Sequence, residues 1–202
     1  MLDTRTDTRE GLAPELQTSD WINTLEPITL ASLLGKVVVL HSFQMLCPGC
    51  VQVGIPQAQK IYEEFDPEKV AVIGLHTVFE HHSVMGKEAL EVFVHEYRLR
   101  FPIGIDKYAD RELDARGAIS VTGHADYNGL PLTMSAYQMQ GTPTLILIDK
   151  VGKLRLHKFG HISDLTLGCS IGTLLSERIA STESPVGSQT NIDLCDEDGC
   201  KV

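Results

Sequence analysis

The sequence has no long apolar run, no cluster of Lys and Arg, and no internal repeat. A membrane-spanning helix needs about 18 or more consecutive apolar residues, so we expect no membrane span. The formal net charge of −10 argues against nucleic acid as the main partner, because phosphate binding depends on clustered basic side chains. Residues 1–20 are polar and acidic, which predicts no signal peptide and a cytoplasmic location.

The composition is that of a folded domain with extensions. Hydrophobic residues make up 43% of the 202 residues, which is enough to bury a core. Residues 1–18 lack hydrophobic periodicity and are expected to form a flexible N-terminal arm, and residues 181–202 a flexible tail. The predicted domain spans residues 19–180 and includes a long connection at 109–140, a length that is usually functional or mobile.

Apolar runs and helical spacing alternate along this domain. The expected strands lie at 34–43, 69–76, 101–106 and, as a hairpin, 142–160. The expected helices lie at 51–65, 86–100, 109–118 and 164–180. Pro56 is expected to kink the first of these helices. The order of the elements predicts a three-layer α/β fold, with a mixed central sheet flanked by helices.

Two of the five cysteines, Cys47 and Cys50, lie where an expected strand gives way to a helix. A helix N-terminus stabilises a thiolate through its free N–H groups and its dipole. Pro48 would occupy the first helical position, where its missing N–H costs little, and the amide of Gly49 would stay free to face the sulfur. The spacing therefore favours Cys47 as an exposed attacking thiol and Cys50 as a shielded resolving thiol.

Two other interpretations of the cysteine pair are open. The thiols could lie together by coincidence, or they could form half of a zinc site. A zinc site would need a second pair of ligands, and the sequence has no second CxxC; Cys195 and Cys200 would have to fold back a long way. In a reducing compartment redox chemistry is the favoured interpretation, and neither a bound metal nor a cofactor is expected.

The segments "GKVVVLHSFQMLCPGC", "VAVIGLH", "FPIGID" and "GTPTLILIDKVGKL" together resemble the thioredoxin superfamily, in particular its TlpA-like and AhpC/TSA-like redoxins. The resemblance implies a thiol–disulfide oxidoreductase with Cys47 as nucleophile and Cys50 as resolving cysteine. It also implies a cis Thr142–Pro143 bond facing the disulfide, with the Thr142 backbone and the Pro48–Gly49 turn at the substrate side. The implied partners are disulfide-bearing proteins or small-thiol disulfides, and an upstream thiol reductant.

The sequence departs from the thioredoxin pattern in several places, and Pro56, the helix proline, lies one residue later than usual. Leu46 replaces the usual Trp before the first cysteine, and the two residues between the cysteines are Pro-Gly in place of Gly-Pro. His41 stands where a buried carboxylate often serves the resolving thiol. An imidazole could transfer that proton near neutral pH, or His41 could be a neutral core histidine hydrogen-bonded to backbone.

A peroxiredoxin-like peroxidase is the main alternative within the superfamily. Peroxiredoxins place Thr three residues before the peroxidatic cysteine and Pro seven before it. These positions hold Gln44 and Leu40 here, so efficient peroxide reduction is not expected.

A copper or other metal carrier of the same fold, and a non-catalytic interaction module, are further alternatives. A carrier would add a distant histidine to the cysteine pair, and the candidates are His76, His81, His82, His95 and His124. The two-residue spacing of the cysteines argues against the carrier, and the intact CxxC argues against the module. Cys169, inside the last expected helix, is interpreted as a small core residue.

The remaining cysteines, Cys195 and Cys200, lie in "CDEDGC" on the tail. They are either part of an incidental disordered end or an auxiliary dithiol that exchanges electrons with Cys47 and Cys50. On a mobile segment of about fifteen residues, these two thiols would have a high effective concentration at the domain surface, on the order of millimolar.

Overall fold

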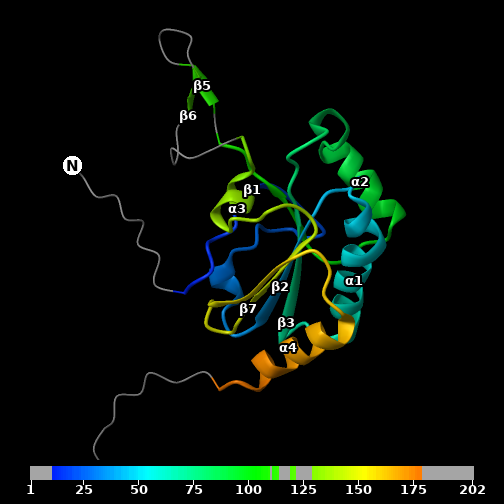
Figure 1. The fold of residues 1–202 in the computed structure, drawn as a ribbon, viewed down its shortest axis with the longest axis vertical. Helices are drawn as coiled ribbons and strands as arrows, with labels where there is room; N and C mark the ends of the chain where they lie inside the picture. The colour runs from blue at the N-terminus through cyan, green and yellow to red at the C-terminus, as the bar shows by residue number, and fades with distance from the viewer. Residues whose placement is uncertain (1–10, 110, 114–118, 122–128, 179–202) are drawn as a thin grey trace, which may run out of the picture.

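A six-stranded mixed sheet forms the centre of the computed structural model, which describes residues 11–109, 111–113, 119–121 and 129–178 (Figure 1). The strand order is β1-β4-β3-β2-β7-β8. The strands are β1 (Thr18–Ile22), β2 (Val37–Phe43), β3 (Val70–His76), β4 (Ile103–Asp106), β7 (Thr144–Ile148) and β8 (Leu154–Phe159). Neighbours β2, β3 and β4 are parallel, whereas β1, β7 and β8 pair antiparallel. The predicted mixed α/β sheet is confirmed.

The helices lie on both faces of this sheet. They are α1 (Ile55–Glu64), α2 (Lys87–Glu96), α3 (Leu132–Ala136) and α4 (Asp164–Ser176), with short turns η1 (Leu30–Leu33), η2 (Cys50–Gly54) and η3 (His82–Val84). Every residue of β2 is buried. Its odd-numbered apolar residues pack with α1, α2 and α4, and its even-numbered ones pack with α3 and η1. The period of two along β2 therefore separates the two halves of the core.

The ordered domain begins earlier than the sequence predicts. The flexible arm was expected to reach residue 18, but Leu16 is buried and Leu12 pairs with Lys153. The Pro14 carbonyl accepts a hydrogen bond from the Tyr137 hydroxyl at 2.6 Å. These contacts join residues more than 100 positions apart, so local periodicity carries no sign of them.

The connection at 109–140 also differs from the prediction. A short helix is expected at 109–118 from the sequence, whereas Arg111–Leu113 (β5) pairs antiparallel with Ile119–Val121 (β6). The following helix α3 is held by Asp106, whose carboxylate accepts hydrogen bonds from the Thr133 and Met134 amides and from the Thr77 hydroxyl. Burial raises the pKa of Asp106 to about 6, against the effect of these hydrogen bonds.

A π-helical stretch, η2, lies just before Pro56, the residue at which the sequence predicts a kink. Helical conformation begins at Pro48 and continues through η2 into α1. Proline has no N–H for the carbonyl four residues earlier. The Ile55 N–H pairs with the Cys50 carbonyl, five residues back, and regular α-helical geometry begins at Ile55 with α1.

Two largely apolar side chains of the helical segments are exposed. Leu90 and Val94 of α2 are buried, whereas Tyr97, which follows the end of the helix at Glu96, is 52% exposed. Cys169 is expected in the core, yet it is exposed on α4. The buried side of α4 consists of Leu167, Ile171 and Leu174.

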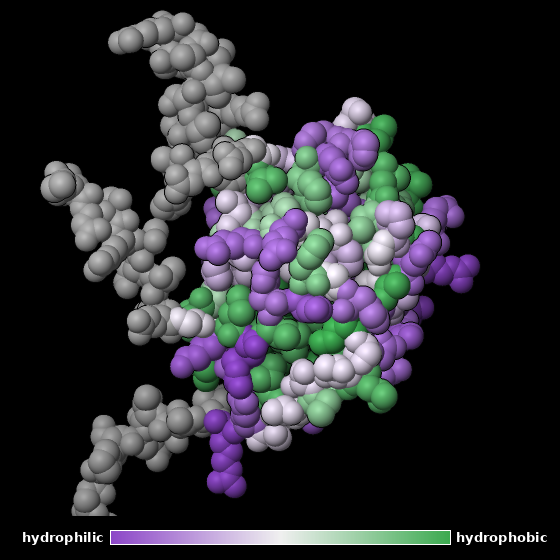
Figure 2. All heavy atoms as spheres, in the orientation of Figure 1, coloured by the Kyte–Doolittle hydropathy of each residue, from purple (hydrophilic) through white to green (hydrophobic). Residues whose placement is uncertain are grey.

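None of the described helices is long and apolar enough to cross a membrane. On the face shown in Figure 2, hydrophilic residues are interspersed among hydrophobic ones.

Candidate active site

Cys47 and Cys50 lie just beyond the carboxyl end of β2. After the strand ends at Phe43, the Cys47 N–H donates to the Gln44 carbonyl at 3.2 Å, which closes a tight turn. The Cys47 carbonyl then accepts the Val51 N–H at 3.0 Å, as in the first turn of a helix. Pro48 is the first helical residue, as the sequence predicts.

The two thiols differ in exposure and in their contacts. Cys47 is partly exposed, whereas Cys50 is fully buried, and both are free thiols. The Cys50 N–H donates to the Cys47 Sγ at 3.2 Å, and the Cys47 Sγ lies 3.5 Å from the Thr142 carbonyl oxygen. Burial raises the pKa of Cys50 to about 12, and the hydrogen bond with Cys47 acts in the same direction. A backbone donor therefore faces the sulfur that solvent can reach.

The Thr142–Pro143 peptide bond is cis, and it lies against the turn between the cysteines. A Cβ on Gly49 would be 3.3 Å from Pro143 Cδ, which is closer than ordinary van der Waals contact. Glycine at position 49 thus allows the helix start and the Pro143 ring to approach each other. The structure brings together two distant segments: Cys47, Pro48 and Gly49 in one, and Thr142 and Pro143 in the other, with Cys47 and Thr142 separated by 95 positions.

Gln44 connects the segments around the cysteines, although the sequence does not mark it as a site residue. Its side chain is 1% exposed. The amide oxygen accepts a hydrogen bond from the Phe79 N–H at 3.2 Å. The amide nitrogen donates to Thr142 Oγ1 at 3.4 Å and to Glu80 Oε1 at 3.5 Å. The sequence shows Gln44 only as a departure from the peroxiredoxin pattern. The signal in the sequence is an amide side chain three residues before Cys47, directly after a buried strand.

His41 lies on β2 beneath the helix that begins after Cys47. The ring is 1% exposed, and neither ring nitrogen has a hydrogen-bond partner among the residues that the structure describes. The hydrogen bond to backbone expected of a core histidine is therefore not formed. Burial lowers the pKa of His41 to about 4, so the imidazole is neutral at neutral pH and does not titrate there.

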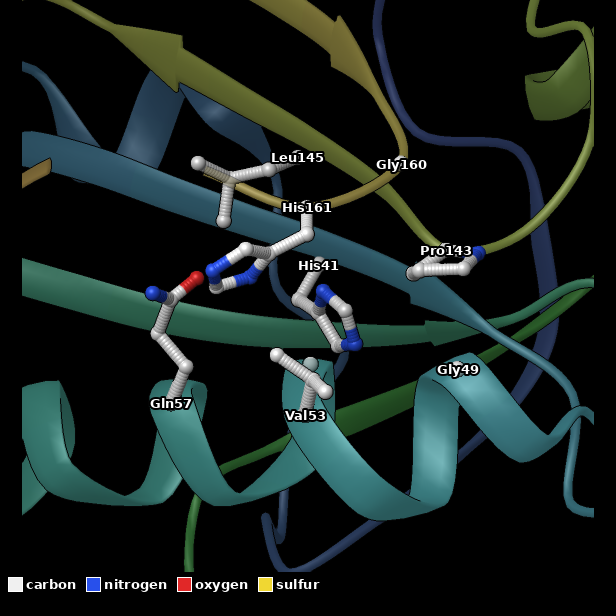
Figure 3. Close-up of a pocket in the computed structure, with 9 residues that line it drawn as sticks. His41, Gly49, Val53, Gln57, Pro143, Leu145, Gly160 and His161 are labelled. Carbon is white, nitrogen blue, oxygen red and sulfur yellow. The ribbon is translucent and has the colours of Figure 1, made fainter. Parts of the chain in front are cut away.

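His41 is part of the wall of a cavity of about 180 Å³. Figure 3 shows the ring above Val53, with Pro143 and Gly49 on one side and His161 on the other. The remaining lining residues are Gly54, Gln57, Leu145 and Gly160. The cavity begins at Gly49 and Pro143, the neighbours of Pro48 and Thr142, and therefore adjoins the cysteine site.

The described histidines considered for a metal carrier form no metal site with the cysteines. His76 is buried on β3, its Nε2 has no partner among the described residues, and burial lowers its pKa to about 4. His81, His82 and His95 are exposed. Within the described parts of the chain, no group of three or more His, Cys, Asp or Glu side chains is placed to hold a metal ion. His124, Cys195 and Cys200 lie outside the described residues.

Known proteins that are similar to this chain are redox proteins of the thioredoxin fold. The sequence model of the AhpC/TSA family matches residues 11–157. Protein DipZ of Mycobacterium bovis and Protein DipZ of Mycobacterium tuberculosis are each 28% identical over 185 residues, or 89% of this chain. The chain spans only 23% of the length of these relatives.

Two crystal structures are more similar in sequence. One is a thioredoxin-like superfamily protein with 51% identity and a TM-score of 0.73, covering 83% of this chain and 97% of that one. The other is a thiol-disulfide isomerase from Corynebacterium glutamicum with 44% identity and a TM-score of 0.71, covering 84% of this chain and 99% of that one.

Proposed function

We propose that this chain catalyses thiol–disulfide exchange through Cys47 and Cys50. It belongs to the AhpC/TSA family and to the thioredoxin-fold thiol–disulfide oxidoreductases. One observation carries this proposal: a buried thiol and a partly exposed thiol share one helical turn, and the backbone N–H of Cys50 points at the Sγ of Cys47. This arrangement stabilises negative charge on the sulfur that a substrate can reach.

In the first step the Cys47 thiolate attacks one sulfur of a substrate disulfide. A bond forms between Cys47 and that sulfur, the substrate S–S bond breaks, and the departing thiolate takes a proton from water. In the second step Cys50 loses its proton and attacks the Cys47 sulfur, which releases the second substrate thiol. Two electrons pass from the protein dithiol to the substrate, and an external dithiol restores the cysteines by the reverse exchange.

The second step requires deprotonation of Cys50. In the free dithiol, burial and the hydrogen bond to Cys47 hold the pKa of Cys50 at about 12. When Cys47 is bound in the mixed disulfide it no longer carries a thiol or a charge, so the contribution of Cys47 to this raised pKa disappears. We propose that neutral His41 takes this proton only transiently and passes it to the departing substrate thiolate, because a pKa of about 4 disfavours a lasting imidazolium.

The substrate is proposed to bind as an extended peptide beside Thr142 and Pro143. The Thr142 carbonyl lies 3.5 Å from the Cys47 Sγ, so backbone hydrogen bonds at this residue would hold a peptide with its disulfide at the attacking sulfur. Small-thiol disulfides would use the same sulfur without this strand pairing.

Turnover of insulin disulfides with dithiothreitol as the reductant tests the assignment. Cys47→Ser should abolish turnover, and Cys50→Ser should accumulate a mixed disulfide that mass spectrometry detects at Cys47. Cys169→Ser is the matched control, because that thiol is exposed but lies on α4, and it should behave like the unmodified protein. Continued turnover by Cys47→Ser would refute the proposed nucleophile.

Peroxide reduction is the second activity to test, because a peroxiredoxin-like peroxidase is the main alternative within the superfamily. Gln44, at the position of the peroxiredoxin threonine, already uses its amide on Phe79 and Thr142. We therefore expect consumption of hydrogen peroxide with dithiothreitol to be slow compared with disulfide exchange.

Two further expectations from the sequence stay predictions: that an upstream thiol reductant supplies the electrons, and that the protein is cytoplasmic.

A further inference from the structure

The cavity beside the cysteine site has the dimensions of a side-chain pocket. Its volume is about 180 Å³, and Val53, Leu145 and Pro143 supply apolar surface. An engineered apolar cavity of about 150 Å³ in another protein is known to bind benzene. The volume therefore suits a single aromatic ring. Val53 and His161 are exposed, so the cavity opens to the surface on the side of η2 and the segment after β8.

Among the polar side chains that line this cavity, that of His41 is buried, and neither of its ring nitrogens has a hydrogen-bond partner in the described part of the chain. A neutral imidazole has one N–H donor and one nitrogen acceptor. Buried polar groups without partners are costly, and a bound hydroxyl would supply the missing hydrogen bond.

We propose that this cavity binds the phenol side chain of a tyrosine in the disulfide-bearing protein substrate, with the phenol hydroxyl hydrogen-bonded to His41. The proposal rests on the proposed function, because the cavity starts at Gly49 and Pro143, beside the attacking sulfur. The apolar wall accepts the ring, and tyrosine combines a large ring with one polar tip. Recognition of this side chain places the neighbouring cysteine of the substrate near Cys47.

Direct binding is tested with p-cresol, the side chain of tyrosine, and with toluene, the side chain of phenylalanine. NMR of the full chain would follow the methyl groups of Val53 and Leu145 and the ring nitrogens of His41. We expect saturable shifts with p-cresol and about 3–10-fold weaker binding of toluene, which lacks the hydroxyl. The absence of saturable shifts, or equal binding of the two compounds, would overturn the proposal.

Two variants test the location of the pocket. Val53→Trp should fill the cavity from η2 and abolish p-cresol binding, and His161→Trp should block it independently from the opposite side. Gln52→Trp is the matched control, because Gln52 is the exposed neighbour of Val53 and does not line this cavity; it should bind p-cresol normally. Normal binding by both Val53→Trp and His161→Trp would place the ligand elsewhere and overturn the proposal.

Substrate preference is measured with peptide disulfides that carry Tyr, Phe or Ala at each position near the cysteine. We expect kcat/KM to be about tenfold higher for the best Tyr peptide than for the matching Ala peptide, and this ratio to fall in Val53→Trp. Binding of p-cresol without any disulfide turnover would refute the proposed function while the pocket stands. Disulfide turnover without p-cresol binding or Tyr preference would refute only the pocket.

Discussion

The His41 imidazole occupies the space that a side chain at position 54 would need. A Cβ on Gly54 would lie 2.3 Å from Cε1 and 2.5 Å from Nε2 of His41, closer than real Cβ contacts come. The pair joins the middle of β2 to the last residue of the π-helical stretch that follows the cysteines. This close approach sets the position of His41 relative to the candidate active site.

Gly54→Ala should therefore destabilise the protein by about 1–3 kcal/mol, because either the helix or the imidazole must move. Urea denaturation measures this change. Gly172→Ala on α4 is the control: a Cβ at that position would meet no atom within 4 Å, and alanine should stabilise the helix by about 0.5–1 kcal/mol. A double variant with His41→Ala should recover part of the loss, since the two residues are in contact. Additive effects would contradict this account.

Alkylation should distinguish the two thiols of the CxxC. Cys47 is partly exposed and accepts the Cys50 N–H, whereas Cys50 is completely buried. In the reduced protein, iodoacetamide should modify Cys47 at least about tenfold faster than Cys50, because the thiolate is the nucleophile. Peptide mapping by mass spectrometry separates these positions from the exposed Cys169. Preferential labelling of Cys50 would reverse the assignment.

Gln44→Met should preserve the volume of the side chain but remove its hydrogen bonds. The Phe79 N–H and the Thr142 hydroxyl would lose their contacts with the amide, at a cost of about 1–3 kcal/mol in the free energy of unfolding. Since these contacts connect the cysteine turn to the Thr142–Pro143 segment, disulfide exchange should also slow. Gln59→Met is the control, because that side chain bonds to Glu63 and Arg100, away from the cysteines. Unchanged exchange in Gln44→Met would show that Gln44 does not position the site.

Among the described residues, three buried groups make stability depend on pH between about 4 and 6.5. Burial lowers the pKa of His41 and of His76 from 6.5 to about 4, so the unfolded chain binds more protons between these values. Their contribution to stability is present above pH 6.5 and is lost as the pH falls towards 4. Asp106 acts in the opposite direction: its pKa is raised from 3.8 to about 6, so its contribution increases as the pH falls from 6 to 3.8.

His76→Leu should therefore reduce the loss of stability on acidification. Between about pH 7.5 and pH 4.5 the variant should lose about 2–3 kcal/mol less than the unmodified protein, as measured by urea denaturation at each pH. Ile73→Val, a change in a buried residue that does not titrate, should lower stability by a similar amount at every pH. An identical pH slope in His76→Leu and the unmodified protein would contradict the prediction.

Local sequence patterns are sufficient to predict the central strand and the helix that follows it. The apolar run at 37–40, three of whose residues are β-branched valines, can be buried on both faces only within a covered sheet, and it forms the first part of β2. Pro48 suits a first helical position whatever surrounds it, and the helix begins there. The position of the cysteine pair at a strand–helix junction follows from these two signals, because they involve neighbouring residues.

Tertiary packing decided the features that depend on distant residues. Cys169 and Tyr97 are largely apolar, like their buried neighbours, so residue type does not predict their exposure. Cys169 lies on the side of α4 that faces solvent, and Tyr97 lies just beyond the end of α2. The antiparallel pairing of β1 with β4 joins residues about 80 positions apart. The contact of Gln44 with Thr142 and the cavity beside His41 likewise form only when β2, the helix after it and β7 come together. Such contacts leave no periodic signal in the sequence, because their energy comes from surfaces that meet only in the folded chain.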